Sequence, residues 1–177
     1  MRKKIVWSAV AIVAAIGIGV GLWAFQPWKV FTSSELHEAS PLAGTATAQP
    51  TEETPDKTEK PEKPTLLASG RFVSQEHETS GTAQVIEQPD GSRVLRLENL
   101  ASSDGPDLHI WVTDATAGLD DWSAYDDGRY VALGKLKATH GSHNYAIPAG
   151  AELDGLRSVV IWCDRFNVAF GSARLDL

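Results

Sequence analysis

Two apolar runs decide the fold class: Leu108-His109-Ile110-Trp111-Val112-Thr113 and Val159-Val160-Ile161-Trp162-Cys163. In the first run, Leu, Ile and Val alternate with His, Trp and Thr, which is typical of a strand with one face on a core. The second run is apolar on both faces, as expected of a central strand that is covered on both sides. Both runs therefore predict strands, and the second predicts a sheet that is buried on both faces.

The same pattern extends on both sides of these runs, as short apolar segments separated by turn residues. Further strands are expected at residues 66–72, 82–87, 93–97, 130–133, 144–147 and 167–170. Pro89-Asp90-Gly91-Ser92 predicts a hairpin between the second and third of these. No segment after residue 66 carries a helical stripe longer than two turns. We therefore predict an all-β fold, with a single antiparallel β-sandwich domain over residues 66–177.

The N-terminus carries a predicted membrane anchor. Residues 5–25 form a run of 21 without a charged residue, directly after Arg2-Lys3-Lys4. A helix of that length spans about 31 Å, which matches the hydrocarbon core of a bilayer. The basic cluster predicts a cytoplasmic N-terminus and an extracytoplasmic C-terminal domain. We expect residues 1–28 to be a cytoplasmic tip and transmembrane helix, with the lipid bilayer as partner through residues 5–25.

A cleaved signal peptide is the alternative for this segment. Its apolar region normally has about 7–15 residues and ends in small residues at a cleavage site. Here the run is longer and ends in Trp23-Ala24-Phe25. The sequence favours a retained anchor, and therefore a single-pass protein of the cell membrane, although both alternatives export the domain.

Residues 29–65 are predicted to be a disordered extracytoplasmic stalk. Residues 38–64 contain no aromatic residue, no Ile or Val, and five of the nine prolines of the chain. Such a segment cannot bury enough apolar area to offset the entropy of ordering it. It is either a spacer that carries the domain away from the membrane or a linker whose length matters little.

The domain is acidic. Residues 66–177 contain 9 Lys and Arg against 16 Asp and Glu. Binding to nucleic acid rests on basic side chains that displace counterions from phosphates. We therefore expect no nucleic acid among the partners, and we expect anionic lipid to repel the domain.

Cys163 is the only cysteine and the first candidate for chemistry. An exported chain with one cysteine has a thiol that is free, paired with another chain, or used as a ligand. Free cysteine is also among the most buried residue types and often acts as a small hydrophobe. The strand period places Cys163 in phase with Ile161, toward a core. The guanidinium of Arg165 would lower the thiol pKa if the thiol pointed toward it.

The histidines and acidic residues give weaker signals. His109 interrupts an apolar strand, on the same face as Trp111. His140 and His143 have a ligand-like spacing, but no third ligand is near them in the sequence, so a polar loop is preferred and no metal site is predicted. The aspartates of residues 120–127 are interpreted as a solvated acidic loop, and their spacing is not that of a calcium-binding helix–loop–helix. No motif of a hydrolase or nucleotide enzyme occurs.

Six segments lie in order along residues 66–175: Thr79-Ser80-Gly81-Thr82-Ala83, Arg93-Val94-Leu95-Arg96-Leu97-Glu98, Ser103-Asp104-Gly105-Pro106-Asp107-Leu108-His109-Ile110-Trp111, Gly134-Lys135-Leu136-Lys137, Asn144-Tyr145-Ala146-Ile147-Pro148 and Val160-Ile161-Trp162-Cys163-Asp164-Arg165-Phe166. Together these segments resemble the DM-thirteen domain. The anchor and stalk resemble the actinobacterial membrane-bound members. The resemblance implies a β-sandwich with an extracytoplasmic electron-transfer role, sometimes beside haem-binding DOMON modules. The family's signature cysteine corresponds to Cys163, as a bare redox thiol or as a ligand to a prosthetic group such as haem.

The expected function is therefore a membrane-anchored extracytoplasmic electron-transfer module centred on Cys163. His109 is the second candidate ligand for a cofactor, haem through Cys163 is the cofactor that the resemblance implies, and a redox protein at the cell surface is the expected partner. The alternative is a non-catalytic cell-surface binding or structural module that uses Trp111, Trp122 and Tyr125. Either function makes the chain a module rather than a stand-alone enzyme.

Overall fold

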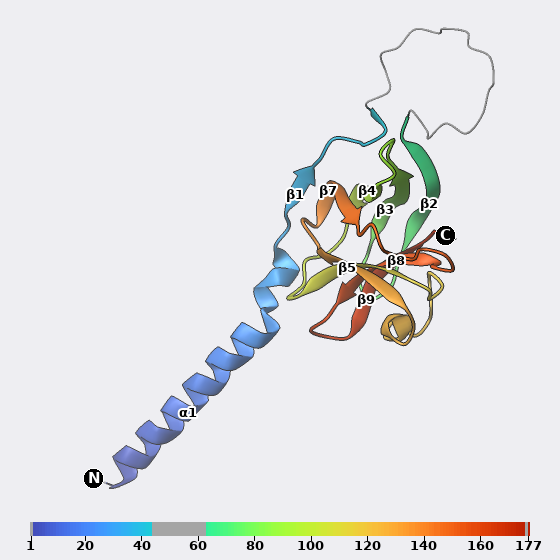
Figure 1. Ribbon diagram of the computed structural model, residues 1–177. Helices are drawn as coiled ribbons and strands as arrows, with labels where there is room; N and C mark the ends of the chain where they lie inside the picture. The colour runs from blue at the N-terminus through green and yellow to red at the C-terminus, as the bar shows by residue number, and fades with distance from the viewer. Residues whose placement is uncertain (1, 44–62, 176) are drawn as a thin grey trace, which may run out of the picture.

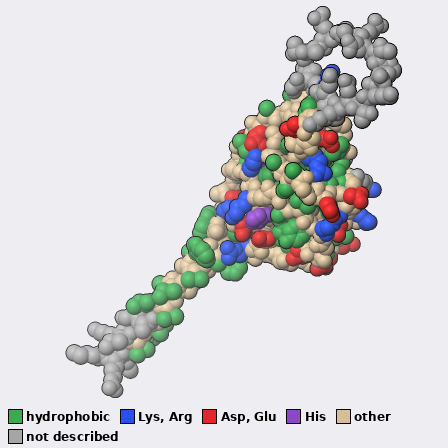
Figure 2. All heavy atoms as spheres, viewed as in Figure 1, with side chains coloured by type: hydrophobic (Ala, Val, Ile, Leu, Met, Phe, Trp, Pro, Cys, Tyr) green, Lys and Arg blue, Asp and Glu red, His purple; other side chains and the backbone are tan. Residues whose placement is uncertain are grey.

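A long helix projects from a compact β-rich body (Figure 1). The computed structural model describes residues 2–43, 63–175 and 177. Helix α1 (Arg2–Phe25) is followed by the short 3-10 helix η1 (Pro27–Phe31). The segment Val10–Lys29 is long and apolar enough to cross a membrane, a property that membrane anchors and signal sequences share. Figure 2 shows hydrophobic side chains along the described part of this helix and at its junction with the body.

Nine strands make up the body. They are β1 (Glu35–His37), β2 (Thr65–Ser74), β3 (Ser80–Glu87), β4 (Arg93–Ala101), β5 (Leu108–Thr113), β6 (Tyr130–Lys135), β7 (His140–Ile147), β8 (Ser158–Cys163) and β9 (Val168–Arg174). All eight strands predicted from the sequence are present, and β3 and β4 pair as the predicted hairpin. Strand β1 was not predicted. The β7 strand also begins earlier than expected, so His140 and His143 lie in a strand and not in a loop.

The strands form one curled sheet in the order β1-β7-β4-β3-β2-β9-β8-β5-β6. All neighbours are antiparallel except β1 and β7, which are parallel. Strand β2 links the two halves, because residues 65–71 pair with β3 and residues 72–74 pair with β9. The all-β class is confirmed, and the expected sandwich of two sheets takes the form of a single sheet bent at β2.

The main core lies inside the curl. Both halves of the sheet contribute to it, for example Val85 and Leu95 from one half and Ile110 and Ile161 from the other, all fully buried. A smaller core covers the outer face of β5, β8 and β9, where the segment after β5 folds back with the short helix η3 (Ala124–Asp126). These two cores explain why β8 is apolar on both faces, and all six of its residues are buried.

Residues 29–39, which we call the strap, lie along the edge of the sheet formed by β7. Glu35, Leu36 and His37 pair with residues 140–142 of that strand. The carboxylate of Glu38 then accepts hydrogen bonds from Lys137 Nζ and from the backbone N–H of Asn144. The strap therefore has secondary structure where the sequence predicted a disordered stalk, while residues 44–62 of that stalk lie outside the described residues.

Because the strap pairs with β7, residues 40–64 do not connect the helix to the domain, contrary to the prediction from the sequence. They run from β1 at one edge of the sheet to β2 in its middle, so they join two strands of the same sheet. The helix is joined to the domain through Gln26, η1 and the strap. In this arrangement the length of residues 40–64 does not set the distance between the helix and the domain.

Candidate functional site

Cys163 lies at the end of β8, with its thiol inside the main core. Its exposed fraction is 0%, and it belongs to the same buried cluster as Leu108, its partner on β5. Burial raises the pKa of the thiol, because a thiolate loses more solvation than a thiol does. At neutral pH the group is therefore a neutral thiol in the closed structure.

Three backbone N–H groups oppose this effect of burial. Those of Phe166, Arg165 and Asp107 hydrogen-bond to the sulfur and lower its pKa, although by less than burial raises it. Donors that converge on one atom favour a negative charge there. The effect of burial outweighs that of these donors, so the neutral thiol is the favoured form in the structure.

The turn after Cys163 closes this site. The backbone N–H of Phe166 donates to the Cys163 carbonyl at 3.2 Å, and that of Asp164 donates to the Asp107 carbonyl at 3.0 Å. The guanidinium of Arg165 does not lower the thiol pKa, since it lies 6.0 Å from the Trp23 ring centroid, over the end of α1. Residues 164–167, which follow Cys163 directly, are all exposed.

His109 lies at the same end of the sheet, on the outer face. Its Nε2 is 3.0 Å from Asp107 Oδ1 and 3.9 Å from Asp164 Oδ2. Lys135 Nζ donates to the same Asp107 oxygen at 2.9 Å, and this ion pair, followed by the His109 hydrogen bond, lowers the Asp107 pKa. The imidazole and the two carboxylates offer three possible metal ligands within 4.8 Å of one another. Lys135 supplies one cation to this cluster through its ion pair with Asp107.

Cys163 and His109 do not meet. The side chain of Cys163 joins the inner core, whereas alternation along β5 places His109 on the outer face with Trp111. One iron would not contact both residues in this arrangement. Haem also needs a large apolar pocket at its ligand, and the Cys163 sulfur is enclosed by close-packed core side chains. The residues around Cys163 therefore do not fit a haem in the closed structure.

The connection between the two residues runs through Asp107. The Asp107 backbone N–H reaches the sulfur, and its side chain is held by His109 and Lys135. His109 therefore contacts the residue whose backbone N–H reaches the thiol, and it does not contact the thiol itself. The sequence carried no signal for this link, because it depends on the pairing of β5 with β8.

The aromatic residues expected on an exposed binding face lie mostly inside the molecule. Trp111 is 6% exposed and stacks between Tyr130, at 4.1 Å between centroids, and Trp162, at 4.9 Å. Tyr125 is fully buried, and its hydroxyl contacts Gln75 and Ser172. Only Trp122 of the three expected residues is exposed.

The other polar candidates have structural roles in the described part of the chain. His140 Nδ1 contacts Thr139 Oγ1 at 2.9 Å, and His143 is fully buried with Nε2 3.0 Å from the His140 carbonyl oxygen. Burial lowers the pKa of His143. Asp121 accepts hydrogen bonds from Ser123 within the acidic loop. Among the described residues, the only group of three potential metal ligands is that around His109.

The fold and site define a class: a single β domain behind a membrane-length helix, with a buried thiol surrounded by amide donors at one end of its sheet. A family model described as Electron transfer DM13 matches residues 71–175. The chain therefore belongs to the DM13 electron-transfer family. No curated protein and no solved structure matches the chain significantly.

Proposed function

We propose that this protein is a membrane-anchored, extracytoplasmic electron-transfer module in which Cys163 is the residue that changes oxidation state. In this proposal α1 is retained as a single-pass anchor, with the N-terminus in the cytoplasm, as in membrane-bound members of the family. Membership of an electron-transfer family supports the redox role. The three N–H donors around the only thiol in the chain are the observation that points to Cys163.

The chemistry follows from the state of the thiol. The reactive form is the thiolate, and burial disfavours it. When residues 164–167 open, the thiol can lose its proton to solvent while the amide donors hold the charge. The thiolate can then attack a disulfide of a redox partner protein, which forms a mixed disulfide and releases one partner thiolate. A second protein with two thiols then attacks the Cys163 sulfur, which releases the first partner with both of its thiols reduced, and the donor's other thiol displaces the Cys163 thiolate as the donor forms its own disulfide. Two electrons thus pass from the dithiol donor to the first partner, and both reducing thiols come from the donor because this chain has no other cysteine.

Thiol exchange tests this function directly. Membranes that contain the full-length protein would be treated with glutathione disulfide, and the mass of the protein would be measured. We expect one glutathione on Cys163, removable by dithiothreitol, and no adduct on the Cys163→Ala variant. A folded wild-type protein that gains no adduct, although the urea-unfolded protein does, would overturn the redox role of Cys163.

The second candidate is a non-catalytic cell-surface binding or structural module. One observation favours it: the thiol is fully enclosed, as expected of a cysteine that only fills the core. This function predicts that Cys163→Ala retains every cellular role of the protein. A null phenotype in that variant, with normal folding and abundance, would exclude it.

A further inference from the structure

The turn after Cys163 touches the end of the membrane-length helix. The Phe166 ring stacks on Phe25 with centroids 6.0 Å apart, at an angle of 20° between the planes. Its neighbour Arg165 lies over Trp23. Phe166 is nevertheless 46% exposed. Two large side chains of the domain thus reach the last turn of α1.

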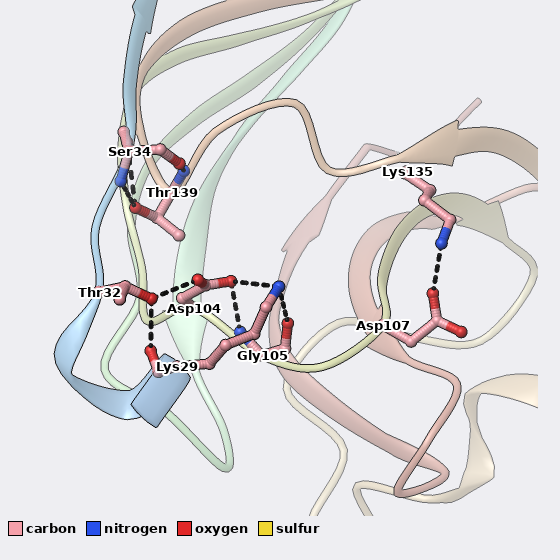
Figure 3. A network of polar contacts seen from close by, with 8 residues as sticks. All are labelled: Lys29, Thr32, Ser34, Asp104, Gly105, Asp107, Lys135 and Thr139. Atoms are coloured by element: carbon pink, nitrogen blue, oxygen red, sulfur yellow. Dashed lines mark hydrogen bonds and ion pairs between the residues drawn. The ribbon is translucent and has the colours of Figure 1, made fainter. Parts of the chain in front are cut away.

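The strap holds the domain in this position (Figure 3). Lys29 Nζ donates to the Gly105 carbonyl at 3.0 Å and lies 3.4 Å from Asp104 Oδ1. Thr32 Oγ1 contacts Asp104 Oδ2 at 2.6 Å. Farther along the strap, Ser34 and Thr139 exchange hydrogen bonds. Several independent contacts therefore fix the domain within a few residues of the helix end.

We propose that turn 164–167 is a second membrane contact and lies in the phospholipid headgroup layer of the bilayer that α1 crosses. This inference rests on the membrane anchorage proposed above. Trp23 stands at the end of the apolar run, where aromatic side chains favour the headgroup region. Phe166 and Arg165 contact that turn of the helix, so they lie at the same depth.

The chemistry of the turn suits this layer. Phe166 offers an apolar ring to the boundary between headgroups and acyl chains, and Arg165 offers a guanidinium to lipid phosphates. Beside the turn is a cavity of about 210 Å³ with a mostly aromatic and apolar lining that includes Phe25, His77, Phe166 and Phe170. Lys29 lies on the same side of the domain, where its charge is paired with that of Asp104. The lipid partner is therefore a zwitterionic phospholipid surface, which does not repel the acidic domain.

This orientation turns the Cys163 end of the sheet toward the bilayer. Turn 164–167 is both the cover of the thiol and the proposed lipid contact. A partner that opens the turn would then approach along the membrane surface. The redox partner of Cys163 is accordingly a membrane protein and not a freely diffusing one.

Quenching by spin-labelled lipid tests the contact. The full chain, with Cys163→Ala to remove the native thiol, would be placed in phosphatidylcholine vesicles that contain a lipid with a nitroxide near the headgroup. A fluorophore would be attached at Phe166→Cys, or at Asp90→Cys in the β3–β4 turn as the control. We expect the nitroxide to remove most of the emission at position 166 and little at position 90. Breaking the strap with Lys29→Ala and Asp104→Ala should reduce the quenching at 166.

Matched controls separate the possible failures. Arg129→Ala removes an ion pair with Glu152 that lies outside both the strap and the Cys163 site, and it should leave the quenching at 166 unchanged. Equally weak quenching at both positions, in protein that stays with the vesicles after an alkaline carbonate wash, would overturn the lipid contact and leave the anchorage intact. Release of the protein by that wash would overturn the anchorage, and the contact with it.

Discussion

Burial decides the chemistry of the individual residues in this domain. The strand period correctly places Cys163 toward the core, because alternation along an extended chain is fixed by backbone geometry. The strand period does not predict where the Arg165 side chain points, because Arg165 lies in the turn after β8. It depends on the helix end, which offers the guanidinium a ring face on Trp23.

The first prediction concerns the size and polarity of residue 163. Cys163→Leu should destabilise the domain by about 1–3 kcal/mol, because the extra methylene groups overpack a filled core. Cys163→Ser should cost less, about 1 kcal/mol, since the amide donors around the sulfur can hydrogen-bond the hydroxyl. Urea unfolding of both variants measures the difference. A larger decrease in the free energy of unfolding for Cys163→Ser than for Cys163→Leu would show that the backbone N–H groups do not hydrogen-bond the side chain of residue 163.

A second prediction uses Tyr145, which is 4% exposed. Burial raises its pKa to about 12, from an ordinary value near 10. The unfolded chain therefore ionises first, so the stability due to the neutral phenol is complete below pH 10 and is lost as the pH rises toward 12. Two pKa units correspond to about 2.7 kcal/mol.

Tyr145→Phe removes this pH dependence. The free energy of unfolding of the variant, followed from pH 9 to 12, should fall less steeply than that of the parent. The variant should start lower at pH 9, because the phenol oxygen accepts a hydrogen bond from the Lys137 backbone N–H. Parallel curves for the two proteins would show that the tyrosine ionises freely in the folded state.

At the level of elements, the sequence predicts the eight strands whose apolar residues mark them locally, and it does not predict β1, which lacks such a pattern. The eight predicted strands contain apolar residues at the strand period. Strand β1 has only Glu35-Leu36-His37, and it is held by pairing with the edge of β7 and by the polar contacts of Glu38. Tertiary contacts of this kind leave no local signal. The bend of the sheet at β2 was missed for the same reason.

The third prediction tests the strap at its closest approach to β7. Gly141 has φ +105°, and a Cβ there would lie 2.1 Å from the Leu36 carbonyl oxygen. Gly141→Ala should therefore displace β1 and speed hydrogen exchange of the Leu36 and His37 amides. Gly134→Ala is the matched control, because Gly134 also has a positive φ, +109°, and an added Cβ meets nothing within 4 Å there. Unchanged exchange in Gly141→Ala would show that β1 is not paired with β7.

The fourth prediction compares two lengths of the domain. Composition alone predicts that residues before 66 add nothing to stability, whereas the structure predicts that residues 32–39 do. A chain of residues 63–177 should melt several degrees below one of residues 32–177, since each kcal/mol lost lowers Tm by about 4–8 °C in a small domain. Equal melting temperatures, measured by circular dichroism, would contradict a stabilising role for the strap.

For the whole molecule, the fifth prediction concerns orientation. The basic cluster Arg2-Lys3-Lys4 is expected to hold the N-terminus in the cytoplasm. Changing all three to Glu should leave a fraction of the chains inverted or uninserted. Protease added to intact cells would then digest less of residues 66–177 than in the parent. Protection of this domain in the parent itself would refute the proposed orientation.

The overall organisation was only partly predictable. The apolar helix and the β domain follow from composition and periodicity, which are local properties. The way the two are joined depends on long-range contacts such as Lys29 with Asp104 and Gly105. The arrangement of Cys163, Asp107 and His109 is equally non-local, since it arises where β5 lies beside β8.

The return of the chain from β1 to β2 has a mechanical consequence. A force that pulls the domain away from the helix acts first on the contacts of Lys29 and Thr32 with Asp104 and Gly105, and then on the short parallel pairing of β1 with β7. If that pairing yields, residues 39–64 become part of the connection between the two bodies. These 26 residues add an extension of up to about 90 Å at roughly 3.5 Å per residue. Tension between the helix and the domain would therefore detach the strap and lengthen the connection before it unfolds the remaining strands.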